Sequence, residues 1–79
     1  MMDLDVNGAT MALHANATIA DLVTALTGRA LDPLGAARDG APLGLAVAVD
    51  AAVVPRARWS RHRLSPGDRV EVLTAAQGG

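Results

Sequence analysis

The chain begins with a regular alternation of apolar and acidic side chains over residues 2–6. A period of two places successive side chains on opposite faces of a strand, so this segment is expected to be a strand with one buried face. Asn7 and Gly8 follow it, and this pair is favoured in a type I′ hairpin turn. Apolar side chains at alternate positions continue over residues 9–14, which predicts a β-hairpin at the start of the chain.

A helix is predicted after the hairpin. Thr18 and Asp21 have the spacing of a capping box, in which the side chain of each residue binds the backbone N–H of the other. Gly28 is a typical helix-stop residue. The apolar residues between these signals recur at the i, i+3, i+4 and i+7 positions of one helical face: Ile19, Leu22, Val23 and Leu26. We therefore expect one amphipathic helix of about three turns.

Segment 28–44 contains several glycines and prolines without sustained periodicity, which predicts a long loop with a helical turn over 34–38. Residues 45–49 are almost entirely apolar, as expected of a strand in the middle of a sheet. A turn and a short apolar segment, 53–54, come next. Because Pro55 lacks the N–H needed for sheet pairing, we expect this segment to lie at the sheet edge.

The last predicted strand, 69–72, alternates between polar and apolar residues after a proline-containing turn at 65–68. The resulting order is hairpin, helix, loop, strand, short edge strand and strand. This order predicts an α+β fold of the β-grasp type, with a mixed four- to five-stranded sheet packed on one α-helix. One domain is expected over residues 1–74. Its core is expected to contain Leu22, Leu26, Val47 and Val72.

The composition excludes several classes of function. The chain has no cysteine, which removes disulfides, thiolate nucleophiles and cysteine-based metal sites. Its formal net charge of −1 lacks the strong positive charge of a nucleic-acid binder. No apolar run is long enough to span a membrane or to form a secretory leader, so we expect a cytoplasmic location. His14 and His62 share no short spacing and make a poor ligand set, so we expect neither a metal site nor a cofactor.

A series of short motifs occurs along almost the whole chain. In order they are Val6-Asn7-Gly8, Thr18-Ile19-Ala20-Asp21-Leu22, Ala46-Val47-Ala48-Val49, Val54-Pro55-Arg56 with Trp59, Gly67-Asp68-Arg69-Val70-Glu71-Val72, and Gln77-Gly78-Gly79. Each motif is weak by itself, but together they resemble the ThiS family of sulfur carriers. The chain departs from the family pattern at Asp50, where Asn is usual, and in its longer loop at 28–44.

The resemblance implies a ubiquitin-like domain followed by a flexible tail of residues 75–79. The reacting group would be the C-terminal carboxylate of Gly79. A ThiF-like adenylating enzyme would activate this carboxylate with ATP, and a sulfur-donating persulfide enzyme would convert it to a thiocarboxylate. A thiazole synthase would then use the sulfur to build the thiazole of thiamine. Gln77, Gly78 and Gly79 would thread the active sites of these partners, because glycine adopts backbone angles closed to other residues. The resemblance also implies that the chain has no catalytic residue and is not an enzyme.

Arg56, Trp59 and Leu73 are candidates for a partner surface outside the tail. Arg56 belongs to a basic stretch that either docks an acidic partner or is a solvated loop. Trp59 either caps the aliphatic core or contacts a partner. Leu73 is expected to point outward beside the small side chains of Ala46 and Ala48, which would leave an apolar patch on the open face of the sheet.

Other functions remain open on the sequence alone. The small subunit of molybdopterin synthase resembles this fold and ends in the same diglycine, although Val54-Pro55-Arg56 and Trp59 favour the thiamine branch. A protein modifier would join Gly79 to lysines of other proteins. A β-grasp interaction module would carry no sulfur, and a terminal Gly79 argues against it.

Overall fold

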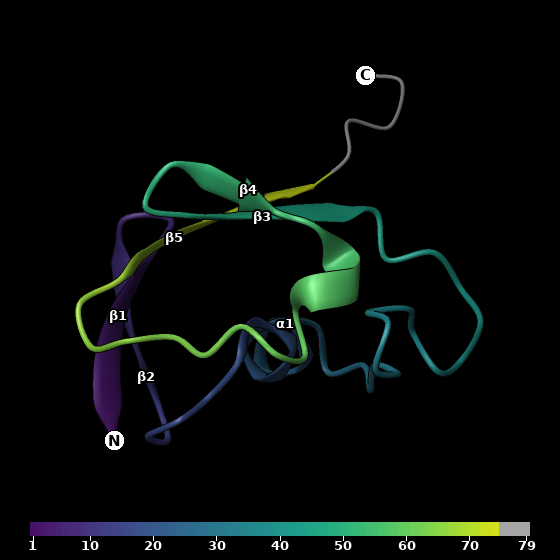
Figure 1. Cartoon of the computed structure of the whole chain (residues 1–79), viewed down its shortest axis with the longest axis horizontal. Helices are drawn as coiled ribbons and strands as arrows, with labels where there is room; N and C mark the ends of the chain where they lie inside the picture. Colours follow the sequence, from purple (N-terminus) through teal and green to yellow (C-terminus); the bar gives the residue numbers. More distant parts are fainter. Residues whose placement is uncertain (75–79) are drawn as a thin grey trace.

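A five-stranded mixed sheet and one α-helix make up the computed structural model, which describes residues 1–74 (Figure 1). The strands are β1 (Met2–Val6), β2 (Ala9–Leu13), β3 (Leu45–Val49), β4 (Ala52–Val54) and β5 (Arg69–Thr74), and the helices are α1 (Ile19–Thr27) and the short 3₁₀ helix η1 (Arg56–Arg58). Their order across the sheet is β2-β1-β5-β3-β4. Strands β1 and β5 are parallel, and the other neighbours are antiparallel. The predicted β-grasp arrangement is confirmed, and β4 lies at the edge as expected.

The two ends of α1 follow the capping chemistry that the sequence predicts. The Asp21 N–H donates to the Thr18 hydroxyl at 3.2 Å, and the Thr18 N–H donates to the Asp21 carboxylate at 2.9 Å. At the other end, Gly28 adopts a φ of 73° and its N–H donates to the Thr24 carbonyl at 2.8 Å. None of the helices within residues 1–74 has the length and apolar character needed to cross a membrane.

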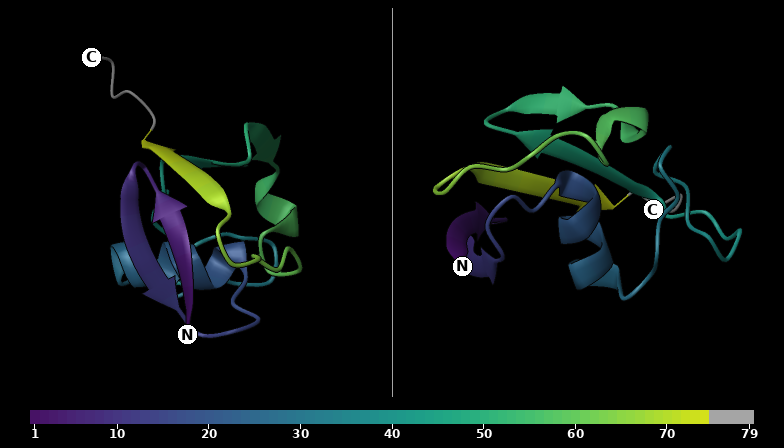
Figure 2. Two further views of the ribbon diagram at one scale, coloured as in Figure 1. Left: turned by 90° about the vertical axis from the view of Figure 1, so that its left-hand side faces the viewer. Right: turned by 60° about the horizontal axis from the view of Figure 1, so that its bottom comes forward.

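The core lies between α1 and the inner face of the sheet, and Figure 2 shows the helix against that face from two further directions. The largest side chains that are almost completely buried belong to Trp59, Leu4, Ile19, Leu22, Val23, Val47 and Val70. Val72 is partly buried against this cluster. The placement of Leu26 in the core was wrong, since its side chain is 45% exposed. The buried face of α1 ends at Val23, so the last turn of the helix extends beyond the core.

The predicted loop at 28–44 is held together by one arginine. Arg29 donates to the Asp39 carboxylate at 2.8 and 3.1 Å, and to the carbonyl oxygens of Ala41 and Pro42 at 2.7 and 3.1 Å. The hydrogen bond to Asp39 raises the pKa of Arg29. The same bond, assisted by the Ala41 N–H, lowers the pKa of Asp39. The loop is therefore a defined structure organised around an ion pair.

The helical turn predicted over 34–38 does not form. The carboxylate of Asp32 accepts hydrogen bonds from the N–H groups of Leu34 and Ala36, both at 2.9 Å. These bonds capture N–H groups locally and favour a tight turn over a helix, as short acidic side chains commonly do. Gly35 follows with a φ of 85°, which is incompatible with a right-handed helix.

Candidate functional site

Strand β5 occupies the centre of the sheet and leads toward the C-terminal residues. Val70 is completely buried, and its strand pairs with β1 on one side and with β3 on the other. Because side chains alternate along a strand, Glu71 and Leu73 project from the outer face, away from α1. The predicted tail, 75–79, lies outside the described residues, and with it Gln77, Gly78 and Gly79.

The outer face of the sheet carries a group of apolar side chains near the end of β5. Leu73 is 59% exposed and lies opposite Ala46 in the β3–β5 register. Val53 is 73% exposed and lies opposite Ala48 in the β3–β4 register. We call Leu73, Ala46 and Val53 the outer apolar patch. The prediction that Leu73 points outward beside Ala46 is confirmed, and exposed apolar side chains that gather in this way commonly mark an interaction surface.

Trp59 belongs to the core. Only 1% of the residue is exposed, and the indole N–H donates to the Val54 carbonyl at 2.9 Å. This bond satisfies the polar group of an otherwise apolar side chain, as a buried tryptophan requires. Of the two interpretations that the sequence left open, core packing is the one the structure supports. A partner would reach little of Trp59 itself, because only 1% of the residue is exposed.

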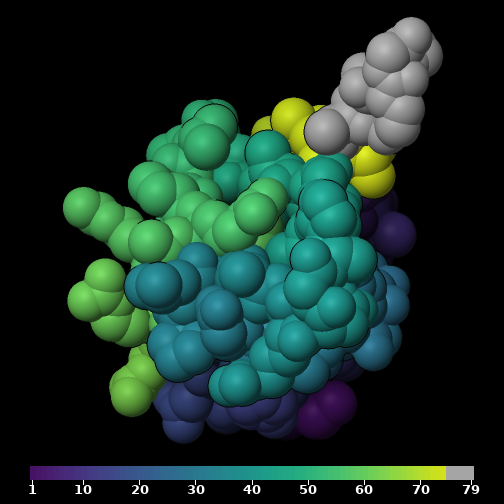
Figure 3. All heavy atoms as spheres, turned by 90° about the vertical axis from the view of Figure 1, so that its right-hand side faces the viewer, coloured from purple at the N-terminus to yellow at the C-terminus, as the bar shows by residue number. Residues whose placement is uncertain are grey.

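Arg56 is exposed but is tied to its neighbours. Its guanidinium carbon lies 5.7 Å from the centre of the Trp59 ring, within the range of a cation–π contact. Loop 28–44 packs against the same residue at Gly35, where a Cβ would lie 2.5 Å from the Arg56 carbonyl oxygen. The Ser60 hydroxyl also donates to the Pro33 carbonyl at 2.8 Å. Figure 3 shows the blue-green loop packed beside the green η1 segment.

The structure does not combine the predicted surface residues into one site. Arg56 follows edge strand β4 and lies over Trp59, which packs beneath the sheet. Leu73 lies on central strand β5, on the outer face, with β3 between β5 and β4. The outer apolar patch is therefore the candidate docking surface nearest to the C-terminal residues.

Two polar residues in hairpin turns, Asn7 and Asp50, bind β5 through their side chains. The Val72 N–H donates to Asn7 Oδ1 at 2.8 Å, and Asn7 Nδ2 donates to the Val72 carbonyl at 3.2 Å. On the opposite side, the Arg69 N–H donates to Asp50 Oδ1 at 3.1 Å. Asn7 and Asp50 have φ angles of 52° and 49°, the left-handed values expected of the first residue in a type I′ turn. The only sequence signal for these hydrogen bonds to β5 is the position of each residue in a hairpin turn.

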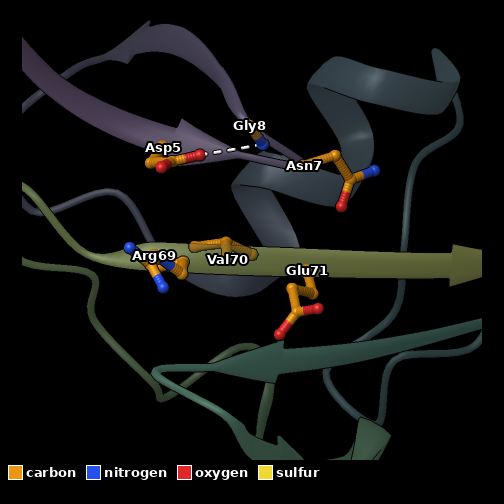
Figure 4. Close-up of a pocket in the computed structure, with 6 residues that line it drawn as sticks. All are labelled: Asp5, Asn7, Gly8, Arg69, Val70 and Glu71. Atoms are coloured by element: carbon orange, nitrogen blue, oxygen red, sulfur yellow. Dashed lines mark hydrogen bonds between the residues drawn. The ribbon is translucent and has the colours of Figure 1, made fainter.

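A shallow depression of about 480 Å³ lies where the first hairpin turn meets β5. Its lining residues are Asp5, Asn7, Gly8, Arg69, Val70 and Glu71 (Figure 4). Within it, the Asp5 carboxylate accepts the N–H of Gly8 at 2.9 Å and so stabilises the turn. Both acidic and basic groups line the depression, and among residues 1–74 no cluster of side chains suited to a metal ion is present.

A mixed sheet with its final described strand in the centre, and one helix across its inner face, defines a ubiquitin-like β-grasp protein. The chain belongs to the ThiS family, whose model matches residues 4–79. ThiS proteins are small sulfur carriers of thiamine biosynthesis and not catalysts, so this chain is a sulfur carrier and not an enzyme. Carriers of this family interact with enzymes that activate and transfer sulfur.

The chain is also similar to a solved structure, that of the thiamine biosynthesis protein ThiS from Geobacter metallireducens. The two superimpose with a TM-score of 0.67 and 22% sequence identity, over 99% of this chain and 100% of that one. At this identity the similarity establishes the fold alone. No curated protein matches the chain.

Proposed function

We propose that this chain carries sulfur into thiazole formation in thiamine biosynthesis, as a thiocarboxylate on the C-terminal carboxyl group of Gly79. The observation that carries this proposal is the family match, which extends beyond the described residues through Gly78 and Gly79. The position of β5 supports it. A strand paired on both sides gives the C-terminal residues a rigid base from which to reach a partner.

The chemistry requires activation, because a free carboxylate is a poor electrophile. The Gly79 carboxylate attacks the α-phosphate of ATP on a ThiF-like adenylating enzyme, which forms an acyl-adenylate and releases pyrophosphate. The terminal sulfur of a protein persulfide then attacks the acyl carbon and displaces AMP, which joins the carrier to the donor through an acyl disulfide. A second thiol attacks the donor sulfur, forms a disulfide with it, and leaves the thiocarboxylate on the carrier.

Three kinds of partner follow from this sequence of reactions: the ThiF-like enzyme, the sulfur-donating persulfide enzyme and a thiazole synthase. The outer apolar patch is the proposed docking surface, since it adjoins the strand that leads to the tail. The need for ATP supports a cytoplasmic site of action. All cofactors and sulfur nucleophiles belong to the partners, and the carrier contributes one carboxylate, which is the nucleophile only in the adenylation step.

The decisive experiment is mass spectrometry of the intact chain after incubation with the ThiF-like enzyme of the same organism, ATP, magnesium and a persulfide donor. We expect a species heavier by the mass difference between sulfur and oxygen. Deletion of Gly79 should abolish this product, and so should the addition of one residue after Gly79. Both variants should retain their thermal stability, because neither change affects the core. Sulfur incorporation at the wild-type rate into the chain without Gly79 would contradict the proposal.

A second measurement separates the alternatives. The purified thiocarboxylate should support thiazole formation with a thiazole synthase and should not replace the small subunit of molybdopterin synthase. An isopeptide adduct on lysines of other proteins, in place of the thiocarboxylate, would indicate a protein modifier. The absence of any modification would favour a simple interaction module.

A further inference from the structure

Within this proposed function, we propose that Asn7 is a positioning residue that fixes the end of β5 and so sets the direction in which the C-terminal residues leave the domain. Its side chain makes two hydrogen bonds to the backbone of one residue, Val72, at a separation of 65 positions in the sequence. Figure 4 shows this side chain extending from the first hairpin turn toward β5.

The side chain of Asn7 takes the place of the next step in the β1–β5 ladder. The backbone N–H groups of Asp5 and Asn7 donate to the carbonyls of Asp68 and Val70, at 3.0 and 2.9 Å. In a continued parallel ladder the Val72 N–H would donate to a backbone carbonyl of β1, and the Val72 carbonyl would accept a backbone N–H. The chain instead turns away at Asn7 and Gly8, and the Asn7 amide supplies both the acceptor and the donor.

The turn itself does not require this amide. A type I′ turn needs a residue that tolerates positive φ at its first position, and glycine meets that need as well as asparagine does. Asp5 already holds the turn through the N–H of Gly8. The two hydrogen bonds to Val72 therefore add an attachment beyond what the turn demands.

The hydrogen bonds from Asn7 to Val72 lie close to the C-terminal residues that react in the proposed function. Val72 is seven residues before Gly79. Antiparallel pairing with β3 continues to Thr74, whereas strand pairing with β1 ends at Val70. Asn7 thus holds β5 on the side where strand pairing has stopped. A fixed exit direction lowers the entropy lost when the C-terminal residues enter a partner's active site.

Asp50 provides a matched control within the same molecule. It occupies the first position of the other two-residue hairpin turn, has a φ of 49°, and accepts a hydrogen bond from the backbone of β5. Its partner is Arg69, at the start of the strand and not at its end. Asn7→Gly and Asp50→Gly therefore each remove a side chain from the first position of a hairpin turn, the first with two hydrogen bonds to Val72 and the second with one to Arg69.

The test combines NMR relaxation of the free carrier with steady-state kinetics of the ThiF-like enzyme from the same organism, using ATP–pyrophosphate exchange. For Asn7→Gly we expect lower amide order parameters at Leu73 and Thr74. We also expect a kcat reduced about three- to tenfold, with a KM for the carrier within about twofold of wild type, since the docking surface is unchanged. Asp50→Gly should leave the order parameters of Leu73 and Thr74, kcat and KM near their wild-type values.

Asn7→Asp tests the hydrogen bonds of the amide without changing the hairpin turn. Asp-Gly also forms type I′ turns, and the carboxylate can still accept the Val72 N–H, but it cannot donate to the Val72 carbonyl. We expect kcat to fall for this variant too. Wild-type kcat in both Asn7 variants, or equal losses in Asn7→Gly and Asp50→Gly, would overturn the positioning role while leaving the proposed function intact. A wild-type chain that the enzyme does not activate at all would instead overturn the proposed function.

Discussion

Trp59 links the interior of the domain to its surface through three separate interactions. Its ring fills the core, its N–H is satisfied by the Val54 carbonyl, and its face lies beneath the Arg56 guanidinium. Gly35 in turn packs against Arg56 and leaves no space there for a Cβ. Packing thus explains the presence of Arg56 and Trp59 after edge strand β4.

Leu22 and Leu26 lie one helical turn apart and test which face of α1 is buried. Leu22 is completely buried, whereas Leu26 is 45% exposed. We expect Leu22→Ala to lower the free energy of unfolding by about 2–5 kcal/mol, because it removes buried methyl groups and leaves a cavity. Leu26→Ala should cost less than about 1 kcal/mol. Urea denaturation measures both, and equal losses would contradict the helix orientation described above.

At the scale of elements, loop 28–44 is stabilised by polar contacts more than by a core of its own. Arg29 gathers the Asp39 carboxylate and two backbone carbonyls, which closes the segment from Arg29 to Pro42. The contacts of Arg29 lie within the loop, so they can be lost without unfolding the sheet.

The ion pair predicts a dependence of loop closure on pH. The Arg29 hydrogen bond lowers the pKa of Asp39 in the folded state, so the stabilisation is present above the usual aspartate pKa of about 4 and is lost as the pH falls through the lower folded value. We expect hydrogen exchange at the Ala41 N–H to become faster relative to its intrinsic rate below about pH 4. Asp39→Asn should remove this change, and core amides should show no local opening in either protein. A pH-independent protection in wild type would contradict the pairing.

At the scale of the whole molecule, the outer apolar patch and the C-terminal residues belong to the same end of β5. This arrangement predicts that docking and reaction can be separated by mutation. Leu73→Ser should raise the KM for the carrier about tenfold with little change in kcat, as expected when an exposed apolar contact of an interface is lost. Leu34→Ser is the control, because Leu34 is 69% exposed and lies in loop 28–44, outside the patch. Equal effects of the two substitutions on ThiF-like enzyme kinetics would exclude the patch as the docking surface.

Sequence periodicity accounts for most of this architecture. The alternation of apolar and polar residues predicted the hairpin and β5, and the capping box of Thr18 and Asp21 predicted the start of α1. These signals could be read from the sequence because they involve residues only two or three positions apart. The exposure of Leu26 could not be predicted, since it depends on where the sheet ends relative to the helix. The bonds from Asn7 to Val72 and from Asp50 to Arg69 also join distant segments, and no local pattern encodes them.

The central position of β5 also has a consequence for biosynthesis of the protein. Strands β1 and β3, which flank β5, are made first and have no direct pairing with each other. The sheet therefore cannot close until residues 69–74 have emerged from the ribosome, and such distant contacts form late in folding. A nascent chain that lacks β5 has neither a complete sheet nor the terminal residues. Under the function proposed above, no chain therefore offers the carboxyl group of Gly79 before the strand that closes the sheet has been made.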